Sequence, residues 1–262
     1  MTTDALRVHV HGHVATLTLN RPDKRNAITF DMWSEIAEIV SQLAANPAAK
    51  VLVITGEGAH FCAGADISGL TEGNGGRYGD ANRAAEEAIA AFPGPSVAMI
   101  RGSCVGGGVQ IINACDIRIA DTTAQFGITP AKLGIIYPTY ALRRAVEIIG
   151  PTATKHLLFS GELIDATRAL RIGLVDELVQ PEELETRVQS LVHVMATERS
   201  HLTQVATKQM VKQIIADGDV SDSLAQHWAD EVNRSGEDKE GVNAFLEKRL
   251  PRFPYSRDSG NA

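Results

Sequence analysis

The sequence has few cysteines, few aromatic residues and no long apolar run. Its 262 residues include three cysteines, and aromatic side chains make up 5% of the chain. Cys62, Cys104 and Cys115 are odd in number and form no CxxC pair, which favours reduced thiols over a disulfide framework. No apolar run approaches the roughly 20 residues of a membrane-spanning helix, and the first residues lack the apolar stretch of a secretory signal. We therefore expect a cytoplasmic protein without a membrane partner.

Basic residues are outnumbered by acidic ones. Lys and Arg total 25 against 32 for Asp and Glu, so the formal net charge is −7. This balance argues against a nucleic-acid partner. The chain also has no GxGxxG motif following a strand, no GxxxxGK[ST] motif and no GxSxG motif. Nicotinamide chemistry, nucleotide hydrolysis and serine hydrolysis consequently lose support.

Metal-binding patterns are also scarce. The HExxH motif is missing, and His9, His11 and His13 are the only alternating set of candidate ligands. Gly12 places a turn within that set, and no carboxylate or cysteine completes a ligand shell at strand spacing. We expect no metal site.

Hydrophobic periodicity predicts alternating strands and helices. Apolar and polar residues alternate at 8–10 and 14–19, which predicts two strands joined by a tight turn. Helical spacing covers residues 29–43, and residues 51–55 form a short apolar strand. The pattern continues with a helix at 82–91, a strand at 97–101, a helix after residue 106 and a strand at 117–120. This alternation indicates an α/β fold.

Two regions depart from the alternation. Residues 71–81 contain four glycines and few apolar anchors, which predicts a mobile surface loop placed to gate a site. Beyond residue 180 the periodicity is helical throughout, and the last residues, from 256 to 262, form a polar tail that we expect to be frayed. We predict a core at residues 1–197 and a helical C-terminal region at 198–262.

Two glycine-containing segments carry the main chemical signal. Residues 106–108 are three glycines that directly precede an amphipathic helix, and residues 61–66 likewise lie between a strand and a helical segment. Glycine lets the backbone approach a ligand without a Cβ atom, and a helix N-terminus has unpaired N–H donors and a positive dipole end. Each segment can contribute one N–H to an oxyanion hole. The alternative is that the glycines serve only close packing.

In their order along the chain, these segments resemble the crotonase family, also called the enoyl-CoA hydratase/isomerase family. The resemblance covers nearly the whole chain and rests on residues 19–22, 26–27, 61–66, 106–108, 133–135, 173–176 and 245–249. It implies a spiral of ββα units, a helical C-terminal trimerisation region and a coenzyme A thioester whose carbonyl oxygen lies between two backbone N–H groups. By match to the motifs, the donors are Ala65 and Gly107, and they would stabilise the charge of an enolate.

The resemblance also implies contacts with coenzyme A, and no cofactor beyond that moiety of the substrate. It assigns them to Lys24, Arg25, Ala27, Ala63, Asp66, Ile67, Phe245 and Lys248. Phe245 and Lys248 match positions that reach the ligand from the same or a neighbouring subunit in relatives, and a solvated helix face is the alternative. Ser68 replaces a common lysine, which removes one phosphate contact. The implied assembly is a homotrimer or a hexamer.

Both glutamates that hold and activate water in typical hydratases of this family are replaced. Gln110 stands at the first position, where it follows the triple glycine, and Pro130 stands at the second. An amide and an imino acid do not exchange protons as carboxylates do. Hydration by paired carboxylates, and isomerisation through the second glutamate, are therefore in doubt.

The Thr129-Pro130 pair and Tyr137 resemble the decarboxylase branch of the family, which acts on methylmalonyl-CoA-like substrates. Loss of carbon dioxide generates the enolate without a general base. Tyr137 would orient or shield the leaving carboxylate, and Gln110 would hydrogen-bond it. The resemblance is partial, because that branch has histidine where this chain has Ala65.

Plain structural roles remain open for the same residues. Gln110 is otherwise a packing residue, Tyr137 an aromatic at a helix start, and the Thr129 hydroxyl a turn cap. We favour a lyase that decarboxylates an acyl-CoA. A true enoyl-CoA hydratase with atypical residues and a non-catalytic acyl-CoA-binding protein are the alternatives.

Overall fold

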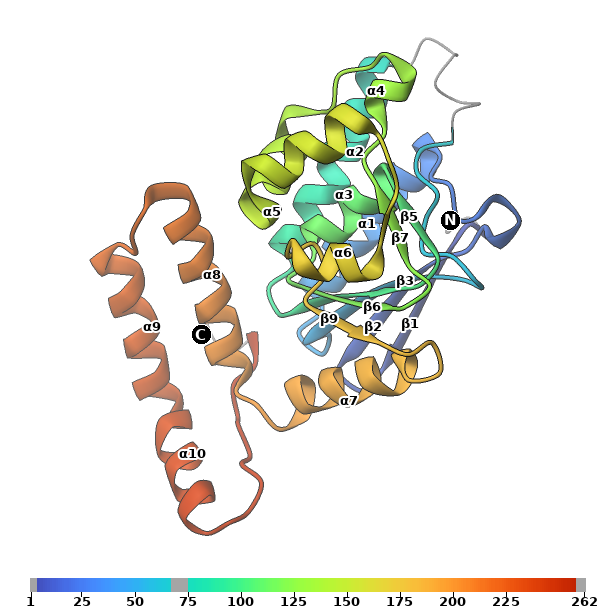
Figure 1. Ribbon diagram of the computed structural model, residues 1–262. Helices are drawn as coiled ribbons and strands as arrows, with labels where there is room; N and C mark the ends of the chain where they lie inside the picture. Colours follow the sequence, from blue (N-terminus) through green and yellow to red (C-terminus); the bar gives the residue numbers. More distant parts are fainter. Residues whose placement is uncertain (1–3, 67–74, 258–262) are drawn as a thin grey trace.

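The computed structural model describes residues 4–66 and 75–257 as two sheets enclosed by helices (Figure 1). The larger sheet has the strand order β1 (Leu6–His11), β2 (Val14–Leu19), β3 (Val51–Gly56), β4 (Ser96–Ile100), β6 (Ile117–Asp121) and β9 (Glu177–Val179). The smaller sheet has the order β5 (Ser103–Val105), β7 (Gln125–Gly127) and β8 (Ile164–Asp165).

The first two strands form the predicted hairpin. Strands β1 and β2 are antiparallel from Leu6 opposite Leu19 to His11 opposite Val14. Gly12 takes a φ of +56° in the turn, which a glycine adopts without strain. The remaining neighbours in the large sheet are parallel, and every residue of β3 is buried because both faces of the sheet are covered.

The two sheets are linked by a repeated ββα unit. Strand β4 of the large sheet leads into β5 of the small sheet and then α3 (Gly107–Ala114). Strand β6 leads in the same way into β7 and α4 (Pro130–Leu133). A bridge between Cys62 and Cys104 brings the segment after β3 alongside β5. This is the α/β spiral that the family resemblance implies.

Helices pack on both faces of the large sheet (Figure 1). On the side of the small sheet lie α1 (Phe30–Ala45), α2 (Gly75–Ala91), α3, α5 (Thr139–Ser160) and α6 (Ala166–Arg171). Helix α1 begins where Thr29 caps it, with the Thr29 side chain accepting from the Met32 N–H at 3.2 Å. Its apolar stripe, including Trp33 and Ile36, is buried as its periodicity predicts.

The predicted surface loop at residues 71–81 is wrong over most of its length. Residues 71–74 lie outside the described residues, but α2 begins at Gly75 and the chain from there to Ala91 is helical. The Tyr78 hydroxyl accepts a hydrogen bond from the Trp33 indole at 2.8 Å, which ties the first turns of α2 to α1. Tertiary contacts thus override the glycine content of this segment.

The C-terminal helices divide between the sheet and an arm. Helix α7 (Leu184–Thr197) covers the second face of the large sheet, where Leu184 and Val188 pack with strand residues. Helices α8 (His201–Asp217), α9 (Asp222–Ser235) and α10 (Glu237–Leu246) form an arm that extends away from the sheets (Figure 1). Residue 198 lies in the turn between α7 and α8. Whether the two parts are separate domains stays a prediction.

The chain returns from the arm to the core. Arg257 donates hydrogen bonds to the carbonyl oxygens of Ala44 at 2.6 Å and Ala49 at 2.9 Å, so the start of the predicted frayed tail is anchored. Residues 258–262 lie outside the described residues. Among the described helices, none combines the length and apolar character needed to cross a membrane.

His201 joins the arm to the core and makes stability sensitive to acid. The side chain is 2% exposed at the start of α8, and its ring packs against Gly94. Burial, reinforced by the charge of Arg257, lowers the pKa of His201 from 6.5 to about 4. Because the unfolded chain binds the proton more readily, this stabilisation is complete above pH 6.5 and is lost as the pH falls toward 4. We expect a loss of about 3 kcal/mol over that range.

Chemical denaturation at several pH values checks this expectation. The variant His201→Gln should lose unfolding free energy less steeply between pH 6.5 and 4 than the wild type does. His193→Gln, at an exposed position on α7, is the matched control and should keep the wild-type slope. Equal slopes in all three proteins would contradict the assignment.

Candidate active site

The two glycine-containing segments meet at one point. Gly64 and Gly106 take φ values of +108° and +51°, a region that favours glycine. A Cβ atom built on Gly106 would lie 3.8 Å from the Gly64 Cα, and one on Gly107 would lie 3.7 Å from the Ala65 nitrogen. The backbones therefore approach each other without intervening side chains.

The pairing of Ala65 decides where its N–H points. Ala65 forms a parallel bridge with Ile28, in which the Ile28 N–H donates to the Gly64 carbonyl and the Asp66 N–H donates to the Ile28 carbonyl, both at 2.8 Å. In such a bridge the central residue directs its own N–H and carbonyl away from the partner strand. The Ala65 N–H thus points away from Ile28 and toward the glycines of the second segment.

Gly107 supplies the second donor. It is the first residue of α3, where the N–H has no partner within the helix. Within residues 4–66 and 75–257, neither the Gly107 N–H nor the Ala65 N–H donates to a protein acceptor. Two adjacent unused donors at the positive end of a helix can stabilise an oxyanion.

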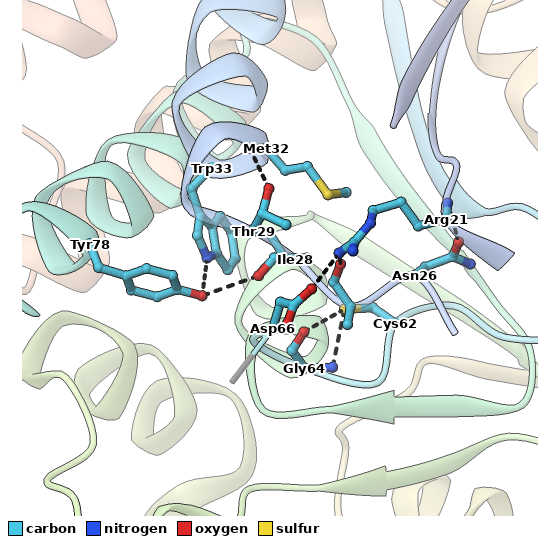
Figure 2. A network of polar contacts seen from close by, with 11 residues as sticks. Arg21, Asn26, Ile28, Thr29, Met32, Trp33, Cys62, Gly64, Asp66 and Tyr78 are labelled. Carbon is cyan, nitrogen blue, oxygen red and sulfur yellow. Dashed lines mark hydrogen bonds and ion pairs between the residues drawn. The ribbon is translucent and has the colours of Figure 1, made fainter. Parts of the chain in front are cut away.

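Trp33 and Tyr78 support this arrangement from α1 and α2 (Figure 2). The Tyr78 hydroxyl accepts from the Trp33 indole and donates to the Ile28 carbonyl at 3.4 Å. A Cβ atom on Gly107 would lie 3.0 Å from the Trp33 ring, so the indole packs directly against the start of α3. Burial raises the pKa of Tyr78 to about 12, which keeps its hydroxyl protonated.

Gln110 lies one turn into α3 and is 7% exposed. Its Oε1 accepts a hydrogen bond from Asn82 Nδ2 at 3.3 Å, and Asn82 Oδ1 accepts from the Tyr140 hydroxyl at 2.5 Å. The Nε2 group is the hydrogen-bond donor of the Gln110 side chain.

Comparison with known proteins identifies the family. A family model described as enoyl-CoA hydratase/isomerase matches residues 9–256. The chain belongs to this family, which is the crotonase family. The (E)-benzylidenesuccinyl-CoA hydratase of Thauera aromatica is 35% identical over 257 residues, covering 94% of this chain and 97% of the relative. The crotonyl-CoA hydratase of Syntrophomonas wolfei is 32% identical over 244 residues, covering 92% and 94%.

Solved structures agree with the family assignment. An enoyl-CoA hydratase/carnithine racemase from Magnetospirillum magneticum has a TM-score of 0.91 at 28% identity, covering 96% of each chain. An enoyl-CoA hydratase/isomerase family member reaches a TM-score of 0.88 at 36% identity, covering 97% of this chain and 99% of that structure.

In this crotonase-family chain, an ion pair holds the segment at residues 61–66 against the turn that precedes α1. Arg21 Nη1 lies 2.9 Å from Asp66 Oδ2 and also donates to the Ala27 carbonyl at 2.6 Å (Figure 2). Asp66, predicted to contact coenzyme A, is therefore engaged with Arg21. The residue pattern at 19–22 marks Arg21, but only the fold shows its partner.

Asn26 is fully buried and stabilises the same turn. Its Oδ1 accepts from the Arg21 N–H at 2.9 Å, and its Nδ2 donates to the carbonyl oxygens of Glu57 and His60. Its φ of +56° is one that asparagine tolerates better than most residues. In the sequence Asn26 stands out only as part of the 26–27 motif, and the fold shows which groups it binds.

Apart from Asp66, the predicted coenzyme A residues fall into three groups. Lys24 and Arg25 are exposed on the turn that contains η1 (Pro22–Lys24), and the Arg25 carbonyl accepts from the Ala63 N–H at 2.8 Å. Lys24, Arg25, Ala27 and Ala63 therefore lie next to the segment that holds Ala65. Ile67, like Ser68, lies outside the described residues.

Phe245 and Lys248 form the third group, and the fold does not place them next to that segment. Phe245 is the penultimate residue of α10 and is largely exposed, while Lys248 follows the helix. Figure 1 shows α10 in the arm, apart from the start of α3. Contact of Phe245 or Lys248 with a ligand stays a prediction.

The thiols near the site are structural. Cys62 Sγ accepts a hydrogen bond from the Gly64 N–H at 3.3 Å, and burial raises the pKa of Cys62 to about 12. A thiol that stays protonated is not a nucleophile. Cys62, Cys104 and Cys115 are all buried and free, as the sequence predicts.

The histidines near the site and in the first hairpin make ordinary structural contacts. His60 is half-buried, and its Nδ1 accepts from the Ser103 N–H at 3.1 Å. His9 and His11 stack with ring centroids 6.4 Å apart, while His13 bonds to the Ala48 carbonyl beyond the turn. Within the described part of the chain, no group of three or more potential ligands is placed to hold a metal ion.

Three further residues from the sequence analysis lie at or near α4. Pro130 is its first residue, and Thr129 stands at the cap position, where its side chain makes no cap bond to the helix. Tyr137 is 9% exposed and lies just before α5. Burial, with the nearby charge of Glu86, raises the pKa of Tyr137 well above its usual value, so the phenol remains a proton donor.

Proposed function

We propose that this enoyl-CoA hydratase/isomerase family enzyme acts on an acyl-CoA thioester and decarboxylates it through an enolate. The backbone N–H groups of Ala65 and Gly107, which donate to no acceptor among the described residues, support the enolate. The feature that carries the choice of reaction is the buried amide of Gln110 beside those donors, with Pro130 at the other position where the family resemblance implies a glutamate.

The reaction follows from this arrangement. The bond between the α carbon and the substrate carboxylate breaks, and its electron pair moves onto the thioester oxygen as carbon dioxide leaves. The Ala65 and Gly107 N–H groups stabilise that oxygen as the charge develops. Gln110 Nε2 binds the carboxylate before it leaves, without the repulsion that a glutamate would add. A proton donor then converts the enolate into the product.

Hydration is the competing reaction, because several relatives are named as hydratases. Mass spectrometry of reactions with methylmalonyl-CoA and with crotonyl-CoA separates the two. We expect a loss of carbon dioxide from the first substrate and no addition of water to the second. Rapid hydration of crotonyl-CoA would contradict the proposal, and coenzyme A binding by calorimetry without any turnover would favour a binding protein.

The substitution Gln110→Glu tests the role of residue 110 by restoring a carboxylate there. A carboxylate there restores one of the two water-activating groups, so any trace hydration of crotonyl-CoA should rise by about tenfold or more. Decarboxylation should fall, since the new charge repels the substrate carboxylate. Gln189→Glu, at an exposed site on α7, is the control and should change neither rate. Unchanged rates in Gln110→Glu would place residue 110 outside the reacting zone.

We also propose that the enzyme is a homotrimer, or a hexamer of two trimers, in the cytoplasm. Apolar side chains exposed on the arm support an assembly, among them Val211, Ile215, Phe245 and Leu246. Light scattering should give three or six times the chain mass of 28.1 kDa. A monomer would contradict this assembly.

A further inference from the structure

Two hydrogen bonds join Gln110 to residues on α2 and α5 that the proposed reaction does not use. Gln110 Oε1 accepts from Asn82 Nδ2 at 3.3 Å, and Asn82 Oδ1 accepts from the Tyr140 hydroxyl at 2.5 Å. Asn82 is 3% exposed and Gln110 is 7% exposed. The three side chains, here called the amide network, come from three different helices, so the fold and not solvent holds them together.

The amide network reaches Gln110 on the part of α3 that carries the second oxyanion donor. Gly107 and Gln110 are three residues apart and lie on neighbouring turns of one helix face. On α2, Tyr78 and Asn82 are four residues apart and share a face in the same way. Tyr78 accepts from the Trp33 indole, which packs against Gly107 (Figure 2). Asn82 therefore holds Gln110 from a face of α2 that also supports the start of α3.

Tyr140 sets the direction of the hydrogen bonds in the amide network. Its hydroxyl has one hydrogen, and its contact with Asn82 is shorter than its contact with the Gly79 carbonyl, at 2.5 Å against 3.2 Å. A separation of 2.5 Å lies within the range of O–H···O bonds and below that of N–H···O bonds, so the oxygen of Asn82 faces Tyr140. Burial raises the pKa of Tyr140 above its usual value, which keeps this donor protonated. The amide of Asn82 then directs Nδ2 toward Gln110.

The amide of Gln110 is oriented in turn. Because Asn82 presents a donor, Gln110 accepts through Oε1, which leaves Nε2 at the other end of the amide. Nε2 donates to no acceptor among the described residues. The enclosed polar atoms without a partner in this part of the chain include both of Asn113, one turn further along α3, but not Gln110 Nε2. An amide nitrogen that is neither paired nor enclosed is the donor that an anionic group would use.

We propose that Asn82 and Tyr140 are positioning residues that make the acyl site selective for thioesters with an anionic group on the α carbon. They hold the Gln110 amide with Nε2 toward the ligand, where it donates to the substrate carboxylate. An amide free to rotate would also present Oε1, which repels a carboxylate. The inference rests on the proposed function, in which Gln110 binds that carboxylate.

Calorimetry with two ligands that cannot lose carbon dioxide tests this orientation. Propionyl-CoA has a neutral acyl group, and 2-sulfopropionyl-CoA carries a sulfonate where methylmalonyl-CoA carries its carboxylate. The ratio of the two dissociation constants measures the preference for the anion. We expect the wild type to bind the sulfonate about tenfold more tightly, which corresponds to one hydrogen bond to a charged group.

The variant Asn82→Asp reverses the amide network and keeps its shape. A carboxylate accepts from both neighbours, so Gln110 turns Nε2 toward residue 82 and presents Oε1 to the ligand. The preference for the sulfonate should be lost, and the affinity for propionyl-CoA should be almost unchanged. Tyr140→Phe removes the orienting hydrogen without adding a charge and should lower the preference by about threefold. Asn233→Asp, at an exposed position on α9, is the matched control and should keep the wild-type preference.

A double variant separates orientation from direct repulsion by the new carboxylate. In Gln110→Met no amide remains to be turned, so adding Asn82→Asp should leave the affinity for the sulfonate unchanged. A further loss in the double variant would show that residue 82 acts on the ligand directly. That result would overturn the positioning role.

The remaining outcomes distinguish a failure of the positioning role from a failure of the proposed function. A wild-type preference for the sulfonate that persists in Asn82→Asp and Tyr140→Phe would overturn the positioning role and leave the proposed function intact. Equal losses of affinity for both ligands would overturn it too, because a merely structural role lowers both. A wild type that binds both ligands equally would instead contradict the binding of the carboxylate by Gln110. Circular dichroism of each variant checks that the fold is retained.

Discussion

Replacing Gly107 with proline should reduce turnover by about 10² to 10³-fold, which is the usual effect of losing one oxyanion donor. Proline has no N–H, so the change removes one of the two donors directly. Gly107 is the first residue of α3, a position where proline fits the helix and no intrahelical hydrogen bond is lost. The expected signature is a lower kcat with little change in coenzyme A affinity.

Steady-state kinetics and calorimetry measure the two quantities separately. The new ring comes close to Trp33, because even a Cβ atom on Gly107 would lie 3.0 Å from that indole. Thermal unfolding therefore accompanies the kinetics. Asp222→Pro introduces proline at the first residue of α9, far from the site, and controls for a general effect of proline. Full turnover by a folded Gly107→Pro variant would rule out the Gly107 N–H as a donor.

The substitution Trp33→Ala should destabilise the protein by about 4 kcal/mol, as expected for removing a large aromatic side chain from a packed core. Trp33 is 0% exposed, packs against Gly107 and donates to Tyr78. Losing it opens a cavity and leaves the Tyr78 hydroxyl without that donor. Turnover should fall as well, because the start of α3 loses its support.

Urea unfolding gives the change in the free energy of unfolding. Two milder variants separate the contribution of packing from that of the hydrogen bond. Trp33→Phe keeps most of the packing but loses the indole N–H, and Tyr78→Phe removes the hydroxyl. We expect each to cost about 1–2 kcal/mol. A Trp33→Ala variant as stable as the wild type would show that α1 does not support the site.

Local patterning predicts the elements of the fold that are long or strictly periodic. The stripe of α1 and the alternation of the first hairpin are set by neighbouring residues, so they are readable from the sequence. Strands β5 and β7 span three residues each, which is too short for a periodic signal. Helix α2 begins within a glycine-rich stretch because contacts such as that of Tyr78 with Trp33 stabilise it.

The same distinction applies to the site. Glycine motifs in family order point to Ala65 and Gly107, and the fold brings their backbones together, although their catalytic role stays a prediction. The pairing of Arg21 with Asp66 depends on how separate segments pack, so it has no local signal. The contact between Glu86 and Arg144 joins residues 58 positions apart and is visible only in three dimensions.

A crystal structure with a bound acyl-CoA tests the central claim most directly, because it shows which groups surround the thioester oxygen. The account predicts that this oxygen lies about 2.7–3.1 Å from both the Ala65 and Gly107 nitrogens. It also predicts that the α carbon faces Gln110 and Tyr137. A thioester oxygen bound elsewhere, with both N–H groups remote from it, would contradict the oxyanion hole and the reaction derived from it.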